Sequence, residues 1–342
     1  MRLSLWLPTF THGDPDFRSL GDSARLAERA GFDGIYLIDH LLPIEGVHVS
    51  AWLDTLVGLG LLAAATERVT IGTACLVAGL RHPVPLAKQL ASVAVCAGPR
   101  VVLGAAPGWY APEYEALGYR VTERGARTDE TLEAVRLLLS DDRVTFRGRY
   151  WAFDGVTIEP KPKTLIPIFI CGGSRTKEAG SDQDRPEIAP GVLRRISRWD
   201  GWVAPCAGRE ELTFRDLDLV RTHVQGSLGA GGSFQYLHVQ WTHVVASEDR
   251  ERALREQLPR FRALMGEHHS DRHLIDTYLV GSPEDIQVRV ERIRDRGFDE
   301  LIVGPVTHDP AQIELIASVL RPVCAGRPSG RPAAQTPSLR DE

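Results

Sequence analysis

Short apolar runs rich in β-branched and aromatic residues alternate with segments of helical periodicity along most of the chain. The apolar runs predict strands at residues 3–7, 34–38, 69–73, 101–104, 167–171, 201–204, 237–245 and 300–304. The periodic segments predict helices at residues 19–31, 51–66, 84–97, 124–140, 191–198, 209–225, 248–265, 283–297 and 310–322. Apolar strands that alternate with helices favour parallel pairing through right-handed crossovers. Eight such units predict an α/β fold, a closed (β/α)8 TIM barrel that forms one domain over residues 1–325.

Three segments interrupt this alternation. Residues 141–166 carry short aromatic runs between glycine turns, which predicts an insertion that forms a hairpin over the barrel mouth. Residues 175–190 are polar and rich in Gly and Pro, so we expect an inserted loop there. Residues 326–342 have the composition of a disordered tail.

Composition and charge narrow the class of protein. The chain has 342 residues, of which 43% are hydrophobic and 25% charged, and its formal charge is −5. Because acids and bases are interleaved without a basic stripe, we expect no nucleic-acid partner, and no apolar run has the roughly 20 residues that span a membrane. Five widely spaced cysteines without a Cys-x-x-Cys pair favour reduced thiols in a cytoplasmic protein.

Two titratable residues end the second predicted strand, in the stretch Gly34-Ile-Tyr-Leu-Ile-Asp39-His40. In a TIM barrel the loops that follow the strands form the working face, so Asp39 and His40 are placed to point into the mouth. Histidine titrates near neutral pH and suits acid–base work. The spacing leaves an alternative open, in which Asp39 accepts backbone hydrogen bonds and His40 is a hydrogen-bonded residue of the rim.

Three other strand ends are also unusual. Residues 72–75 are small and could let a flat ligand approach the backbone, and residues 103–114 combine small residues with rings and one acid, Glu113. Gly172-Gly173-Ser174-Arg175 could present N–H groups and charge to a phosphate, although a tight turn into a solvated loop is the alternative. We predict no metal site, and we expect the group His268, His269 and His273 to be a solvated surface.

Eight blocks in order between residues 1 and 320 resemble the luciferase-like monooxygenase superfamily, among them ERAGFDGIYLIDHLLP, VVLGAAPGWYAPEYEALGY and FRGRYWAFDGVTIEPKPKTLIPIFICGGS. The Asp-His pair and the FDGVTIEPKP…GGS run are most similar to the branch that uses the deazaflavin coenzyme F-420. The other branch uses reduced FMN with oxygen.

The resemblance implies a coenzyme across the barrel mouth, with Asp39 and His40 at the reactive edge of the ring and a non-proline cis peptide at Ala74–Cys75. The cofactor-binding residues that it implies are Asp39, Ala74, Cys75, Gly104, Ala106, Gly108, Gly172, Gly173 and Ser174. Candidates for the substrate side are Trp6, His12, Trp109 and Tyr110, with the aromatic hairpin as a partial lid.

The chain departs from the family pattern at two places. Sugar-phosphate dehydrogenases of the F-420 branch carry a glutamate where this chain has Trp109, which argues against sugar-phosphate oxidation and leaves the acid–base role to His40. The loop at 175–190 leaves open whether Arg175, Arg194 or neither accompanies the phosphate.

We therefore expect hydride transfer between F-420 and a medium-sized, partly apolar organic substrate, with His40 as general acid or base and Asp39 orienting it. One alternative is a monooxygenase that uses reduced FMN and oxygen. Another is a coenzyme-free barrel that binds or supports a partner. Apolar outer helix faces such as WLDTLVGLGLLAAA allow a homodimer.

Overall fold

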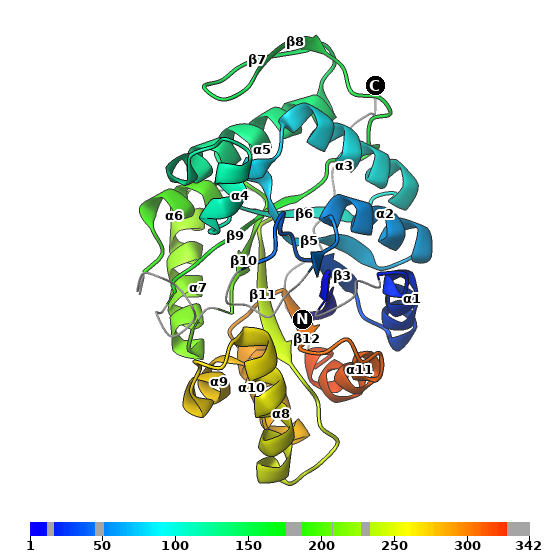
Figure 1. Ribbon diagram of the computed structural model, residues 1–342, viewed down its shortest axis with the longest axis vertical. Helices are drawn as coiled ribbons and strands as arrows, with labels where there is room; N and C mark the ends of the chain where they lie inside the picture. The colour runs from blue at the N-terminus through cyan, green and yellow to red at the C-terminus, as the bar shows by residue number, and fades with distance from the viewer. Residues whose placement is uncertain (12–16, 45–50, 176–186, 207, 227–232, 327–342) are drawn as a thin grey trace.

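The computed structural model describes residues 1–11, 17–44, 51–175, 187–206, 208–226 and 233–326, and eight parallel strands form a closed barrel (Figure 1). The barrel strands are β1 (Arg2–Leu7), β3 (Gly34–Leu37), β5 (Thr70–Val77), β6 (Val101–Ala106), β9 (Ile168–Cys171), β10 (Gly201–Ala204), β11 (Gln235–Thr242) and β12 (Glu300–Pro305). The barrel closes because β1 pairs with β3 on one side and with β12 on the other. This confirms the predicted fold and all eight predicted strands.

Helices surround the barrel. They are α1 (Leu20–Ala30), α2 (Thr55–Ala65), α3 (Pro83–Ala97), α5 (Arg124–Ser140), α6 (Pro190–Ile196), α7 (Glu210–Gln225), α8 (Arg250–Met265), α10 (Pro283–Asp295) and α11 (Ala311–Cys324), and they confirm the nine predicted helices. In the described residues, no helix combines the length and apolarity that crossing a bilayer requires.

Several short elements were not predicted from the sequence. They are β2 (Phe10–Thr11), β4 (Ala51–Trp52), η1 (Ala78–Leu80), α4 (Ala111–Ala116), η2 (Val121–Glu123) and α9 (Asp271–Thr277). The helix predicted from residue 51 begins instead at Thr55, because Asp54 caps its N-terminus and Ala51–Trp52 pairs with Phe10–Thr11.

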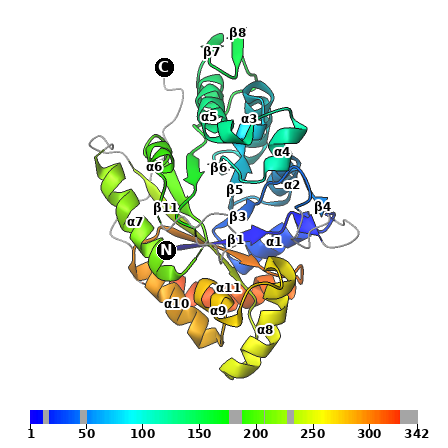
Figure 2. The same cartoon turned by 60° about the vertical axis from the view of Figure 1, so that its left-hand side comes forward.

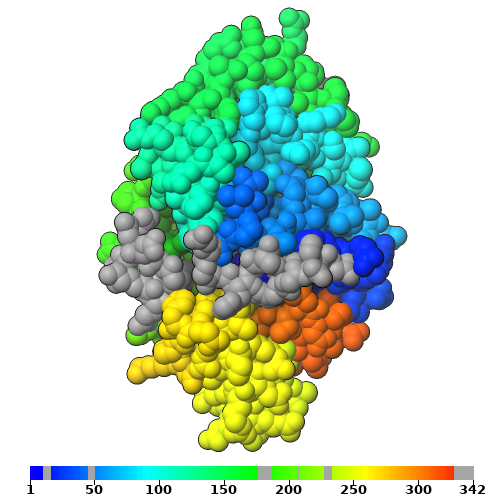
Figure 3. Space-filling model, in the orientation of Figure 1, coloured from blue at the N-terminus to red at the C-terminus, as the bar shows by residue number. Residues whose placement is uncertain are grey.

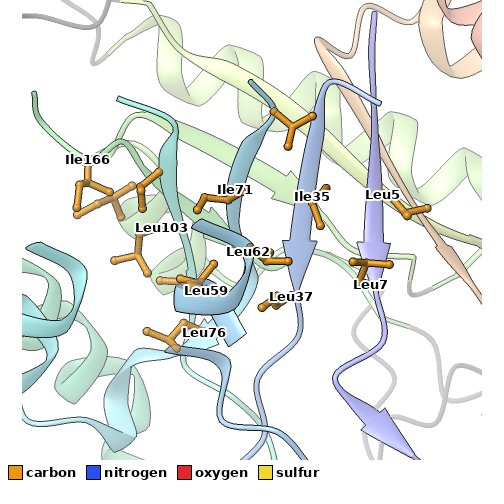
Figure 4. Close-up of a cluster of buried hydrophobic side chains, with 14 of the residues drawn as sticks. Leu5, Leu7, Ile35, Leu37, Leu59, Leu62, Ile71, Leu76, Leu103 and Ile166 are labelled. Carbon is orange, nitrogen blue, oxygen red and sulfur yellow. The ribbon is translucent and has the colours of Figure 1, made fainter. Parts of the chain in front are cut away.

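Alternating residues of each strand serve two separate cores. Leu5, Leu7, Ile35 and Leu37 point outward and pack with helix residues such as Leu59, as Figure 4 shows. The residues between them point inward, because successive side chains of a strand face opposite sides. The inward cluster fills the barrel with residues from all eight strands, including Trp6, Tyr36, Ala74, Val102, Phe169, Val203, Trp241 and Ile302.

The hairpin predicted within residues 141–166 exists, as β7 (Val144–Arg147) and β8 (Ala152–Val156), but the prediction that it covers the mouth is wrong. Glu130 of α5 accepts the backbone N–H groups of Arg149, Tyr150 and Trp151, and the Trp151 indole donates to Thr131 of the same helix at 2.9 Å. The hairpin therefore lies on the outer side of α5, away from the strands (Figures 1 and 2).

In the space-filling view the hairpin forms one end of the molecule and α8 the opposite end (Figure 3). The predictions of a loop at 175–190 and a tail at 326–342 fall mostly on residues outside those described.

Candidate active site

His40 follows β3 and lies against a buried carboxylate. Its Nδ1 is 3.1 Å from Oε1 of Glu113, a residue of α4 that has no exposed surface. The same Oε1 accepts the backbone N–H groups of Leu41 at 2.6 Å and Leu42 at 3.3 Å. Because Nδ1 contacts Glu113, Nε2 is the ring nitrogen of His40 that is left for a ligand.

Both carboxylate oxygens of Asp39 accept hydrogen bonds from other groups of the protein. Only 2% of Asp39 is exposed, and its two oxygens accept the N–H of Val77 at 2.9 Å and Nη2 of Arg81 at 2.6 Å. Burial alone would lower the pKa of Arg81, but the charges of Asp39 and Asp54 together raise it. Asp39 thus ties the end of β3 to β5 and to Arg81, the residue after η1, which matches the alternative in which it accepts a backbone hydrogen bond.

The peptide bond between Ala74 and Cys75 is cis, as the family resemblance implied, and the pairing of β5 with β6 shifts register at this point. Ala74 faces the inward cluster. Burial, followed by a hydrogen bond with Cys75, raises the pKa of the Cys171 thiol. Two thiols from β5 and β9 therefore meet at this end of the barrel, and all five cysteines are free.

Gly104 within β6 and Gly108 in the loop after it are both required by close packing against β5. A Cβ on Gly104 would lie 2.1 Å from the carbonyl oxygen of Thr73. Gly108 has a φ of 68°, and a Cβ there would lie 2.6 Å from Cγ1 of Val77. The close approach of β6 to β5 thus requires glycine at both positions, while Ala106 between them is partly exposed.

Aromatic rings connect the strand ends around His40. Trp52 lies 4.7 Å and Trp109 6.1 Å from the His40 ring, measured between ring centroids, and Tyr110 is 5.6 Å from Trp109. Trp6 lies 4.8 Å from Trp241. Trp109 is 48% exposed, so a ligand can reach it. The candidate His12 lies outside the described residues.

Buried polar atoms test whether this region suits a flat heterocycle. In the described part of the chain, Nε1 of Trp6, Nε1 of Trp52 and Oε2 of Glu113 are buried without a hydrogen-bond partner. Most buried polar atoms in proteins are paired, so two indole donors and one carboxylate oxygen are available for a ligand's carbonyl and N–H groups. The His40 side of the mouth therefore fits a ring of the flavin or deazaflavin type.

The proposed phosphate turn is arranged differently. Ser174 donates its N–H and its hydroxyl to the two carboxylate oxygens of Asp216, each at 2.6 Å. Ser174 and Asp216 are 5% and 4% exposed. Of the two candidate cations, Arg194 is exposed, and Arg175 is partly exposed and lies near Cys206.

The prediction that His268, His269 and His273 form a solvated surface is wrong for two of them. His269 and His273 are 8% and 7% exposed, and their rings stack with centroids 4.7 Å apart. The stacking of these rings against each other and near Tyr278 explains the burial. Among the described residues, no group of three or more His, Cys, Asp or Glu side chains is arranged to hold a metal ion.

Sequence reasoning missed Trp52, Asp216 and Trp241, and gave Glu113 no role. Glu113 was visible as the one acid in the loop after β6, yet its partner His40 is 73 residues away. Asp216 lies on a predicted helix, where its periodicity gave no sign of a partner in the turn after β9.

The sequence model described as luciferase-like monooxygenase matches residues 1–180. The F-420-dependent glucose-6-phosphate dehydrogenase of Beutenbergia cavernae is 34% identical over 207 residues, which cover 57% of this chain and 60% of the relative. The enzyme of the same name from Microbacterium testaceum is 37% identical over 167 residues, 46% of this chain and 48% of the relative. The chain thus spans about half the length of the curated relatives it matches.

Solved structures share the fold over nearly the whole chain. An F-420-dependent secondary alcohol dehydrogenase, in complex with an F-420–acetone adduct, is 18% identical with a TM-score of 0.76, covering 94% of this chain and 98% of the other. The oxygenating constituent of 3,6-diketocamphane monooxygenase from Pseudomonas putida, in complex with FMN, is 16% identical with a TM-score of 0.71, covering 94% and 99%. At these identities the likeness concerns the fold alone.

Proposed function

The chain belongs to the luciferase-like monooxygenase family, and from this premise we propose that it is an oxidoreductase that transfers a hydride between coenzyme F-420 and a medium-sized, partly apolar organic substrate. The observation that carries the proposal is the pair His40–Glu113. A histidine that is 11% exposed, with Nδ1 on a fully buried carboxylate, is a suitable proton donor or acceptor at the barrel mouth.

Each part of the site has a distinct task. F-420 supplies a ring that accepts or gives up a hydride. Trp6, Trp52 and the cis peptide at Ala74–Cys75 would hold that ring, and His40 would give or take the substrate proton at Nε2. Glu113 would hold the His40 ring through Nδ1 and stabilise the imidazolium that forms when Nε2 takes a proton.

Trp109 and Tyr110 favour an apolar substrate. Both relatives named above act on glucose 6-phosphate, as their names state. A half-exposed indole gives neither charge nor strong donors to a phosphorylated sugar, whereas it covers an alkyl or aryl group well. We therefore propose an alcohol or carbonyl compound of moderate size as the substrate.

Coenzyme titration tests the proposal. Quenching of coenzyme fluorescence should show binding of F-420 to the purified protein, and reduced F-420 should be oxidised by members of a panel of aldehydes and ketones without oxygen uptake. Binding of FMN with oxygen uptake would support the monooxygenase instead. A protein that binds neither coenzyme would be the coenzyme-free barrel.

The variant His40→Ala isolates the acid–base role. We expect turnover to fall about 10²–10⁴-fold while the affinity for F-420 changes little. His223→Ala removes an exposed histidine from α7 and serves as the matched control. A rate for His40→Ala equal to that of the control would remove His40 from the chemistry.

We also propose a cytoplasmic homodimer. Val57 and Leu61 of α2 are 58% and 42% exposed, which leaves apolar surface for a second copy. Light scattering coupled to gel filtration measures the mass directly.

A further inference from the structure

The turn after β9 presents two donors that suit an anion. Ser174 offers its backbone N–H and its hydroxyl from one position, which is a common arrangement for holding a phosphate oxygen. Gly172 and Gly173 precede it and remove side-chain bulk from the approach.

A side chain of the protein already takes these two donors. Asp216 reaches from α7, with Oδ2 2.6 Å from the Ser174 nitrogen and Oδ1 2.6 Å from the Ser174 hydroxyl oxygen. A Cβ on Gly173 would lie 3.0 Å from Asp216 Oδ2, so the glycine helps to make room for the carboxylate. The carboxylate occupies the position that an anionic ligand oxygen would take.

Five further residues surround this pair. Ser174 and Asp216 line a pocket together with Ala204, Pro205, Gly208, Leu212 and Thr213. A second anion at this turn would meet the buried carboxylate of Asp216 at contact distance.

We propose that Asp216 is a specificity-determining residue that excludes doubly charged phosphate groups from the β9 turn. The phosphate of FMN is a terminal monoester with nearly two negative charges at neutral pH, whereas that of F-420 is an internal diester with one. Two like charges that compete for the same two donors repel each other, and the repulsion grows with the charge of the ligand. Asp216 thus disfavours FMN relative to F-420. This role of Asp216 rests on the proposed function, because it concerns the choice between the two coenzymes.

A comparison of two ligands shows the contribution of the phosphate group to binding. FMN and riboflavin share the ring and the ribityl chain and differ by the phosphate group. The ratio of their affinities, measured by fluorescence quenching, reports what the turn does with that group. In Asp216→Asn, FMN affinity should rise at least about tenfold while riboflavin affinity stays the same.

Asp218→Asn is the matched control. It changes the charge of α7 by the same amount, but Asp218 is 62% exposed and pairs with Arg296 instead of Ser174. The control should keep the wild-type ratio. Asp216→Ala is a second variant. It removes the side-chain acceptor entirely, whereas the asparagine oxygen can still accept a hydrogen bond from Ser174.

Inorganic phosphate provides a test that does not depend on any ring. It should raise the melting temperature of Asp216→Asn or Asp216→Ala and leave that of the wild type and Asp218→Asn unchanged. If both Asp216 variants show the wild-type FMN-to-riboflavin ratio and no response to phosphate, the inference is wrong. If no flavin or F-420 binds any variant, the proposed function fails, while the phosphate response still decides the role of Asp216.

Discussion

Replacing Glu113 with glutamine perturbs His40 with little change of shape. Glu113 Oε1 accepts three donors, from His40 Nδ1 at 3.1 Å and from the backbone nitrogens of Leu41 and Leu42. The glutamine oxygen can accept the same three donors, so the loop after β3 should keep its path. What disappears is a negative charge that favours the protonated imidazole.

The size of the effect follows from the type of hydrogen bond. A hydrogen bond to a charged group contributes about 1.5–3 kcal/mol, and one between neutral groups about 0.5–1.5 kcal/mol. A transition state in which His40 carries a positive charge should thus lose about 1–1.5 kcal/mol of stabilisation. At about 1.36 kcal/mol per factor of ten, turnover should fall about five- to thirteenfold.

Two measurements check this effect. The turnover of reduced F-420 is measured at a fixed pH, and the melting temperature shows whether the loop after β3 keeps its stability. Glu115→Gln is the control, because Glu115 lies on the same helix but is exposed. The reasoning is refuted if Glu113→Gln and Glu115→Gln give the same turnover.

Two further predictions concern stability. Asp39→Ala should lower the free energy of unfolding in urea by about 3–5 kcal/mol, because it leaves Arg81 buried without its 2.6 Å partner. The control is Asp54→Ala, which removes a 3.2 Å contact with Arg81 and the cap of α2. If Asp39→Ala costs no more stability than this control, a structural role for Asp39 is contradicted. Burial lowers the pKa of His238 to about 4, whereas an unfolded histidine titrates near pH 6.5. The unfolded chain therefore binds the extra proton between these values, so stability should fall on acidification by about 3 kcal/mol, and His238→Gln should flatten this part of the curve. An unchanged slope in His238→Gln would rule out His238 as its source.

The barrel could be predicted from sequence because its signals are local. The outward Leu5 and Leu7 and the inward Trp6 belong to one apolar run, and a run buried on both faces is typical of a parallel strand. The ends of α10 are equally local, because Ser282 caps its N-terminus and Gly297 follows it with a φ of 85°. Short elements such as α4 and β4 have too few residues to show a period.

The site could be predicted only in part, because its contacts are distant in sequence. The rule that strand ends converge located His40, but its contact with Glu113 spans 73 residues and the contact of Asp39 with Arg81 spans 42. Composition also misled: the aromatic hairpin resembled a lid, yet its rings pack with Ala134 and neighbouring residues of α5. No local pattern could reveal that Asp216 would take the donors of Ser174.

The most direct measurement is a crystal structure of the protein soaked with F-420. We predict that the ring lies on the Ala74–Cys75 peptide, between the Trp6 and Trp52 indoles, with its hydride-bearing carbon facing the side of the mouth where Nε2 of His40 lies. A structure in which F-420 lies elsewhere, or in which His40 turns its Nε2 away from the bound ring, would contradict the account.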